Sequence, residues 1–287
     1  MNAPPTPPPE HLALIAGRGA YPLLLAESAR AQGVRRLTVL AFRGETDAAI
    51  RRFADEVHWL HVGQLQALLD ALRGCGARDA VMAGQIRPTN LFRVRMDRAM
   101  LQFLARLKIR NAHTIFGALG DALAALGIAL RPAHLFMESA MPAAGLLSRR
   151  APDEREQGDI ALGRRVAKAV SALEVGQTVV LKEGTILAVE AFEGTDEAIL
   201  RAGRLGGPGA VVVKTAKAGH DMRFDIPVVG LHTLKTLRKI GASALAVEAG
   251  RTILLERERV IAEADRMNLC LTAFAGDPPA DGDQHVG

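Results

Sequence analysis

Charged and apolar residues alternate along residues 221–227, which read Asp-Met-Arg-Phe-Asp-Ile-Pro. In an extended strand, successive side chains point to opposite faces, and side chains two residues apart lie roughly 6.5 Å from each other. The alternation therefore predicts a strand with Asp221, Arg223 and Asp225 on one face. Two carboxylates that flank a guanidinium suit a metal ion, an anionic substrate, or both. The simpler interpretation is an edge strand with an internal ion pair, which Pro227 also favours.

A second group of carboxylates surrounds a predicted turn at residues 190–197. Thr195 is suited to cap the helix that follows, and acidic residues in a first helical turn interact favourably with the helix dipole. Capping does not account for Glu190 and Glu193, because carboxylates gathered at a turn repel one another unless a cation is present. Hard oxygen ligands from Glu190, Glu193 and Asp196 suit Mg²⁺, with Mn²⁺ as an alternative.

A group of cations follows the apolar run at residues 211–213. It comprises Lys214, Lys217, His220 and Arg223. Together with the acidic residues, these side chains predict a mixed-charge site in which cations bind a polyphosphate and carboxylates bind its metal ion. The alternative is ordinary solvated charge on a loop. Lys214, Arg223 and Thr195 are the predicted substrate-binding residues of this half of the chain.

Gly17 and Gly19 stand between a predicted strand and a predicted helix. They match the first two glycines of a dinucleotide-binding fingerprint, but Pro22 occupies the place of the third. The second strand also ends without the acidic residue that would bind a ribose, so the pattern gives an NAD site little support. A glycine turn before a helix N-terminus can still bind a phosphate or a sugar edge. The alternative is a tight turn without a ligand.

The composition excludes some function classes. Only 4% of the 287 residues are aromatic, which argues against stacking on single-stranded nucleic acid. The net charge of +5 suits an anionic membrane surface or a phosphate-bearing substrate. Neither Cys75 nor Cys270 belongs to a CxxC pair, so a cysteine-based zinc or redox site is not expected. Without a signal peptide or a long apolar run, the chain is predicted to be soluble and cytoplasmic.

Apolar runs alternate with segments of helical periodicity along most of the chain. In the first half, strands are predicted at residues 12–16, 37–42, 57–62, 80–83 and 128–136, with helices at 22–32, 64–73, 97–107 and 116–125. In the second half, strands are predicted at 178–181, 186–190, 210–214, 227–229 and 244–247, with helices at 159–173, 196–202 and 234–239. Short strands separated by helices are typical of a parallel sheet covered on both faces.

The predicted fold class is α/β with two domains. The charged, proline-containing stretch at residues 148–158 predicts a linker. It separates an N-terminal Rossmann-like parallel-sheet domain at residues 11–147 from a C-terminal catalytic α/β domain at residues 159–275, with the cleft between them as the expected ligand site. Residues 1–10 and 276–287 are predicted to be disordered tails.

Residues 87–110 are strongly basic, with arginines interleaved among apolar side chains. An amphipathic stretch of this kind can lie at a membrane interface or bind an amphipathic lipid. The alternative is a helix packed on the sheet with an arginine-rich face in solvent.

Four segments, in this order, resemble those of a known enzyme family. They are residues 14–19 (Leu-Ile-Ala-Gly-Arg-Gly), 83–88 (Ala-Gly-Gln-Ile-Arg-Pro), 188–196 (Ala-Val-Glu-Ala-Phe-Glu-Gly-Thr-Asp) and 221–230 (Asp-Met-Arg-Phe-Asp-Ile-Pro-Val-Val-Gly). The family is the two-domain UDP-2,3-diacylglucosamine pyrophosphohydrolase of lipid A synthesis, unrelated to the calcineurin-like phosphoesterase that catalyses the same step elsewhere. The resemblance spans residues 12–275, and its two C-terminal segments are the specific ones.

The resemblance implies a hydrolase that cleaves the pyrophosphate of UDP-2,3-diacylglucosamine to UMP and 2,3-diacylglucosamine 1-phosphate, depends on a divalent metal, usually Mg²⁺, and binds its ligand between two domains. Asp225 matches the family's essential aspartate, and is predicted as a catalytic residue and a metal ligand. Asp221 is the second catalytic candidate. The chain departs from the family pattern at Ala122, where a second acid usually follows Asp121, and at His220, where Gln is frequent. No role is therefore assigned to Asp121 or His220.

Two other function classes remain alternatives at this point: a Rossmann-type NAD oxidoreductase, and a non-catalytic protein that binds a nucleotide or a lipid. The predicted partners are a small glycolipid nucleotide and, transiently, the inner-membrane surface, with no nucleic acid. A homodimer is left open.

Overall fold

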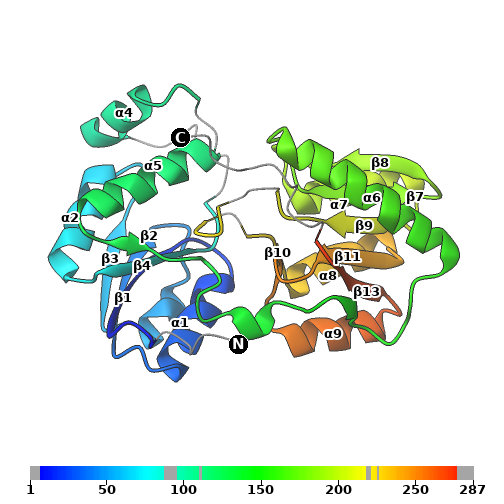
Figure 1. Ribbon diagram of the computed structural model, residues 1–287, viewed down its shortest axis with the longest axis horizontal. Coiled ribbons are helices and arrows are strands. Elements are labelled where there is room, and N and C mark those ends of the chain that lie inside the picture. Colours follow the sequence, from blue (N-terminus) through cyan, green and yellow to red (C-terminus); the bar gives the residue numbers. More distant parts are fainter. Residues whose placement is uncertain (1–6, 87–95, 110–111, 218–220, 225, 277–287) are drawn as a thin grey trace, which may run out of the picture. The chain divides into compact units, whose positions relative to one another are not determined.

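The computed structural model describes residues 7–86, 96–109, 112–217, 221–224 and 226–276 (Figure 1). These residues belong to two compact units. The first contains the chain up to Glu138 together with the segment Asp221–Ile226, and the second contains the rest. The predicted α/β class and two-domain organisation are confirmed, while the predicted tails lie mostly outside the described residues.

The first unit is built on a five-stranded sheet in the order β3-β2-β1-β4-β5, in which all neighbouring strands are parallel. Its strands are β1 (His11–Ala16), β2 (Arg36–Phe42), β3 (Glu56–Leu60), β4 (Asp79–Ala83) and β5 (Ala129–Leu130). Its described helices are α1 (Tyr21–Ala31), η1 (Ala48–Arg52), α2 (Leu65–Cys75), α4 (Arg98–Ala105) and α5 (Ala112–Ala125), and η2 (Glu138–Ala140) follows at the boundary between the units.

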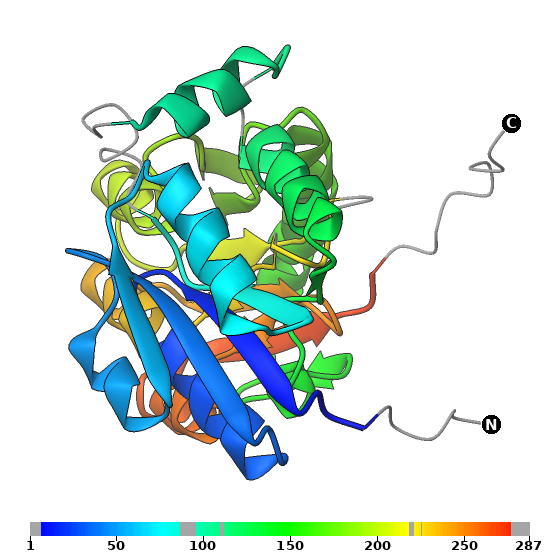
Figure 2. The same cartoon turned by 90° about the vertical axis from the view of Figure 1, so that its left-hand side faces the viewer.

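Strand β1 is buried on both faces, which explains its uninterrupted apolar sequence. Ala13 and Ile15 pack with side chains of α2 and α5, while Leu12 and Leu14 are fully buried on the opposite face. Figure 2 shows the cyan helix α2 lying across the blue strands of this sheet. Because β1 lies between β2 and β4, the strand order reverses at β1, and ligands of open α/β sheets bind at the carboxyl ends of strands at such a point.

The second unit contains a six-stranded mixed sheet in the order β6-β13-β11-β9-β7-β8, and a two-stranded sheet of β10 and β12. The strands are β6 (Gly145–Leu146), β7 (Thr178–Lys182), β8 (Thr185–Val189), β9 (Val211–Lys214), β10 (Val228–Val229), β11 (Ala244–Glu248), β12 (Ile253–Leu254) and β13 (Cys270–Phe274). The helices are α6 (Glu154–Ala172), α7 (Thr195–Gly206), α8 (Leu231–Ile240) and α9 (Arg257–Arg266).

Helices cover both faces of the larger sheet. Val211 and Val213 of β9 pack in the cluster beneath α6, whereas Val212 between them packs with side chains of α7, α8 and α9. Helix α6 approaches the strands closely at Gly163, where a Cβ would come within 2.5 Å of Val213 Cγ2. Figure 1 shows α6 crossing the sheet beside β7 and β9.

The structure corrects the predicted strand at residues 221–224, whereas Asp225 lies outside the described residues. Met222–Phe224 form a turn, in which the Phe224 amide donates to the Asp221 carbonyl at 3.2 Å and the Asp221 carboxylate accepts the Arg223 amide at 3.0 Å. The alternation of charged and apolar residues therefore does not mark a strand here. The Asp221 side chain accepts a hydrogen bond from nearby backbone, and such local bonding competes with strand pairing.

Other elements differ in extent. Helix α6 begins at Glu154 and not at residue 159, so part of the predicted linker is helical. The predicted strand at residues 128–136 is reduced to Ala129–Leu130. Elements β6, β12, α9 and β13 were not predicted.

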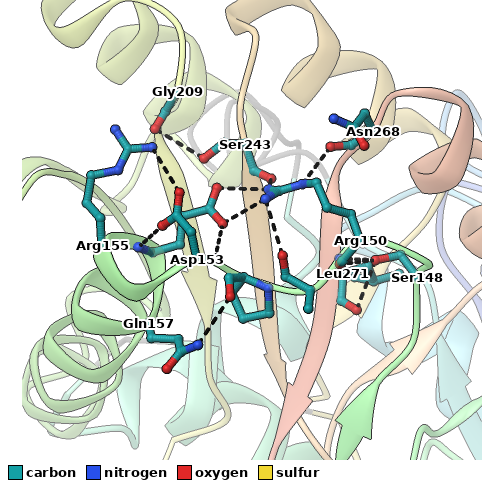
Figure 3. A network of polar contacts seen from close by, with 12 residues as sticks. Ser148, Arg150, Asp153, Arg155, Gln157, Gly209, Ser243, Asn268 and Leu271 are labelled. Carbon is teal, nitrogen blue, oxygen red and sulfur yellow. Dashed lines mark hydrogen bonds and ion pairs between the residues drawn. The ribbon is translucent and has the colours of Figure 1, made fainter.

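The early start of α6 has a clear cause in its N-terminal side chains. Asp153 and Glu156 form a capping box, in which each carboxylate accepts the other's backbone amide, at 2.7 and 2.9 Å. The buried Glu156 also receives two hydrogen bonds from Arg150, at 2.8 and 2.9 Å. Arg150 in turn donates to the carbonyls of Ser243 and Asn268, which precede β11 and β13 (Figure 3). One ion pair thus joins the helix start to the amino ends of two strands.

We expect Glu156→Gln to lower the free energy of unfolding by about 3 kcal/mol, because it leaves a partly buried guanidinium without its carboxylate. Hydrogen bonds from Arg150, Ser243 and the Asp153 amide outweigh the effect of burial and hold the pKa of Glu156 below its ordinary value of 4.5. The ionised Glu156 carboxylate therefore stabilises the fold above pH 4.5, and this stabilisation is lost as the pH falls through the lowered pKa of the folded state. Urea unfolding between pH 3 and 7 measures both effects.

The control is Glu154→Gln, an exposed carboxylate in the first turn of the same helix. Equal losses of stability in the two variants would contradict the assignment of the stabilisation to the Arg150–Glu156 pair.

Candidate functional site at the carboxyl edge of the second sheet

Strands β8, β9, β11 and β13 of the second unit run in the same direction, because β7 is antiparallel to both β8 and β9. Their carboxyl ends therefore meet at one edge of the sheet. Glu190 follows β8, Lys214 ends β9 and Glu248 ends β11. All three of these charged side chains are buried.

Lys214, Thr195 and Glu190 form a linear hydrogen-bonded chain. The Lys214 ammonium donates to Thr195 Oγ1 at 2.8 Å, and the Thr195 hydroxyl donates to Glu190 Oε1 at 2.8 Å. Thr178 Oγ1 lies 3.4 Å from the same hydroxyl. Three of the predicted site residues are thus brought together by the ends of β8 and β9 and the start of α7.

The two charged ends of this chain are incompletely paired. Lys214 is 6% exposed and Glu190 is 9% exposed, so both charges are largely removed from water. Among the described residues, Thr195 is the one hydrogen-bond partner of Lys214 Nζ, and Glu190 Oε2 has none. A buried charge is costly unless it is paired, which marks this edge as a place for a bound ligand or ion.

The structure does not bring Glu190, Glu193 and Asp196 together as one metal-ligand set. Glu193 pairs with Arg201, which is the main reason that its pKa lies below the usual range. Asp196 accepts from Thr236 Oγ1 at 2.9 Å and lies 3.3 Å from His232 Nε2. No group of three His, Cys, Asp or Glu side chains within the described part of the chain is arranged to hold a metal ion.

A smaller donor set still fits Mg²⁺. This ion keeps several waters and is often bound through one or two carboxylates together with substrate phosphates. Glu190 Oε2 is a buried carboxylate oxygen without a described partner, so it is a suitable donor. Asp225 and His220, the other predicted residues of interest, lie outside the described residues.

In the first unit, the glycine turn closes directly on the neighbouring loop. The Gly17 amide donates to the Ala83 carbonyl and the Arg18 amide to the Gln85 carbonyl, both at 2.8 Å. A Cβ on Gly17 would lie 2.6 Å from Gln85 O and 2.8 Å from Gln85 N. Gly17 is therefore explained by close backbone approach, whereas Gly19, with φ of +94°, faces open space.

The segment Asp221–Phe224 packs onto the first unit. The Ala133 amide donates to the Met222 carbonyl at 2.7 Å, and the Phe224 ring lies 5.6 Å from that of Phe116. The Asp221 carboxylate accepts three hydrogen bonds from the Arg223 guanidinium, at 2.6 to 3.0 Å. This pairing is the first cause of the raised pKa of Arg223. The predicted proximity of Asp221 and Arg223 is thus observed, on a turn.

Sequence reasoning missed Glu248, the last residue of β11. It is fully buried and accepts hydrogen bonds from Lys168, Thr215 and the Ala216 amide. A signal was available, because an acidic residue directly follows the apolar run Ala244–Val247. Buried carboxylates at such positions need partners, and their presence points to an organised polar network.

We expect Gly17→Ala to lower the free energy of unfolding by about 1–3 kcal/mol, because the new methyl group would overlap the backbone at Gln85. The matched variant is Gly117→Ala within α5, where a Cβ meets nothing within 4 Å. It should stabilise the protein by about 0.5–1 kcal/mol, since alanine is the better helix former. Thermal and urea unfolding give both values, and a stable Gly17→Ala variant would contradict the close approach.

Comparison with known proteins identifies the family. Residues 11–140 match the family described as LpxI N-terminal domain, and residues 143–272 match the family described as LpxI C-terminal domain. A protein of Caulobacter vibrioides (strain ATCC 19089 / CIP 103742 / CB 15), named UDP-2,3-diacylglucosamine pyrophosphatase LpxI, is 30% identical over 271 residues. The aligned region covers 90% of this chain and 95% of that protein. The chain therefore belongs to the LpxI family.

Proposed function

We propose that this protein hydrolyses the pyrophosphate of UDP-2,3-diacylglucosamine to UMP and 2,3-diacylglucosamine 1-phosphate, a step of lipid A biosynthesis. The main support is a match over 90% of this chain to a relative named for this activity, together with the matches to both family domains. The polar edge of the second sheet supports the proposal, because it offers groups suited to a pyrophosphate.

Lys214 supplies positive charge for the phosphates from a fixed position. Its ammonium is buried and oriented by Thr195, so little reorganisation is needed when charge develops on a phosphate oxygen. Thr195 is the first residue of α7, whose preceding Gly194 provides no side-chain cap. The backbone amides of that first turn are therefore additional donors for an anion.

Mg²⁺, with Mn²⁺ as the alternative, remains a proposal for the cofactor. When bound, it would neutralise charge on the phosphate oxygens and lower the pKa of a bound water. Glu190 and Asp225 are the proposed protein ligands, and Glu193 and Asp196 are left out because their carboxylates pair with Arg201 and with Thr236 and His232.

The segment around Asp225 has separate proposed roles. Asp225 is the proposed catalytic residue, on the family resemblance. Arg223 is the proposed ligand of a phosphate oxygen, and the three hydrogen bonds to Asp221 support Asp221 as the residue that orients it. The glycine turn at Gly17 and Gly19 is the proposed contact of the uridine end or of the sugar phosphate, through the open side of Gly19.

Phosphorus NMR of UDP-2,3-diacylglucosamine incubated with the protein tests the function. We expect the pyrophosphate signals to be replaced by two phosphomonoester signals when Mg²⁺ is present, with EDTA stopping the reaction and added Mg²⁺ restoring it. Binding without release of UMP would indicate a non-catalytic carrier, and hydrolysis that resists EDTA would overturn the metal proposal. An NAD-dependent reaction without UMP release would favour the oxidoreductase alternative.

Two variants test the site. Lys214→Met should lower kcat by about 10²-fold, because a preorganised charge is removed from the reacting phosphates. Lys182→Met is the matched control. The ammonium of Lys182 also donates one hydrogen bond, to the Gly206 carbonyl, but Lys182 lies at the far end of the antiparallel β7. Asp225→Ala should fold normally and bind substrate without hydrolysing it. Wild-type activity in Lys214→Met or Asp225→Ala would refute the corresponding role.

Transient binding to an anionic membrane surface is the second part of the proposal. Met100 and Phe103 of α4 pack against the core of the first unit, whereas Leu101 is 56% exposed. Ile109, beyond the helix, is 64% exposed. The exposed cations Arg98, Arg106 and Lys108 accompany these apolar side chains. Apolar side chains among cations suit an anionic bilayer. No helix in the described ranges has the length and hydropathy needed to cross a membrane.

We expect Leu101→Asp to weaken co-sedimentation with anionic lipid vesicles about tenfold. The substitution removes an apolar side chain that the proposed binding would bury in the bilayer, and it adds a charge that anionic lipids repel. Leu173→Asp, at an equally apolar site that is 74% exposed at the end of α6, is the control. Binding that is unaffected by Leu101→Asp, or by raising the salt concentration, would contradict this surface.

A further inference from the structure

A second polar network lies at the carboxyl edge of the second sheet, beside the chain formed by Lys214, Thr195 and Glu190. Its centre is Glu248, whose two carboxylate oxygens each lie 2.9 Å from Lys168 Nζ. Glu248 Oε2 also accepts from Thr215 Oγ1 at 2.5 Å and from the Ala216 amide at 2.8 Å. The side chain of Glu248 is completely buried.

The network holds one short stretch of backbone from two sides. Glu248 binds the amide of Ala216, while Lys168 donates to the carbonyl of the same residue at 3.0 Å. The amide of the preceding Thr215 donates to the Gln177 carbonyl at 3.0 Å. Residues 215 and 216 are therefore fixed through main-chain and side-chain contacts together.

This stretch directly follows Lys214. In the parallel ladder of β9 and β11, Lys214 is the register partner of Val247, the residue before Glu248. The direction in which the Lys214 side chain leaves the strand therefore depends on how the chain continues through Thr215 and Ala216. A displacement of this backbone would move the ammonium relative to Thr195.

We infer that Glu248 is a positioning residue for the hydrolysis proposed above: it fixes the backbone after β9 and thereby the reacting geometry of Lys214. The inference rests on the proposed function for its kinetic part only. Stability alone is a weak reason to keep a buried ion pair, because apolar replacements of such pairs are often neutral or stabilising. A misplaced catalytic group, in contrast, lowers the rate steeply.

The same unit provides a matched control in Glu156. This carboxylate is also buried and also receives two hydrogen bonds from one cation, Arg150. It lies near Ser243 and Asn268, at the amino ends of β11 and β13, whereas Glu248 lies at the carboxyl end of β11. Removing either charge should destabilise the unit, but only one of them supports Lys214.

The test compares Glu248→Gln with Glu156→Gln in the full-length protein, at a temperature where urea unfolding shows both to be folded. We expect Glu248→Gln to lower kcat for UDP-2,3-diacylglucosamine about tenfold or more with KM within about threefold, and Glu156→Gln to retain kcat. Retained kcat in Glu248→Gln, or the same loss in both variants, would overturn the inference.

A second measurement keeps the outcome independent of the proposed function. Amide hydrogen exchange should show loss of protection at Ala216 in Glu248→Gln but not in Glu156→Gln. If the wild-type protein releases no UMP, the proposed function fails. Amide hydrogen exchange then still tests whether Glu248 fixes the backbone at Ala216. Unchanged protection at Ala216 in Glu248→Gln would overturn the positioning role in either case.

Discussion

The pairing of buried charge inside an otherwise apolar sheet is the constraint on which the second unit depends. Its strands are covered by helices on both faces, so a charge at either edge must find its partners in the protein. At the amino edge, Arg150 and Glu156 satisfy each other and also begin α6. At the carboxyl edge, Glu248 has several hydrogen-bond partners, whereas within the described part of the chain Lys214 has one and Glu190 Oε2 has none. This difference in pairing is the reason for proposing the functional site at the carboxyl edge and not at the amino edge.

In the first unit, close backbone packing and not buried charge is the main feature at the carboxyl edge of the sheet. Gly17 and the loop at Gly84 approach so closely that neither tolerates a Cβ, which closes the backbone at the point where the strand order reverses. In a dinucleotide fingerprint the first glycine allows the tight turn and the second lets backbone approach the pyrophosphate. The close approach at Gly17 and the open space at Gly19 agree with these two roles. The features that argue against a dinucleotide are Pro22 at the third position and the missing acidic residue at the end of β2.

Sequence patterns predicted the elements whose residues are buried on both faces. Strands β1 and β9 each contain a short apolar run, and their short length together with β-branched residues favours a buried strand over a helix. The alternation of charged and apolar residues gave a wrong prediction where a strand and a turn both accommodate it. Alternation at residues 221–227 is as compatible with the observed turn as with a strand, because Asp221 bonds the backbone and side chain of Arg223. Elements α9 and β13 were missed, although β13 forms part of the larger sheet.

The sequence predicted which kinds of residue the candidate site contains, but not which of them lie together. Thr195, Lys214 and Glu190 come together because the ends of parallel strands meet, a consequence of topology that the residue pattern already contained. Glu193 and Asp196 do not join them, because their partners lie on α7 and α8, and short-range spacing cannot reveal contacts with Thr236 or His232.

The chain between Lys214 and Asp221 links these observations. At one end, Glu248 and Lys168 fix Thr215 and Ala216 in the second unit. At the other end, the contact of Met222 with Ala133 and that of Phe224 with Phe116 fix the turn in the first unit. Because Lys214 directly precedes the backbone that Glu248 fixes, the proposed role of Glu248 acts through the main chain and needs no contact between the two side chains.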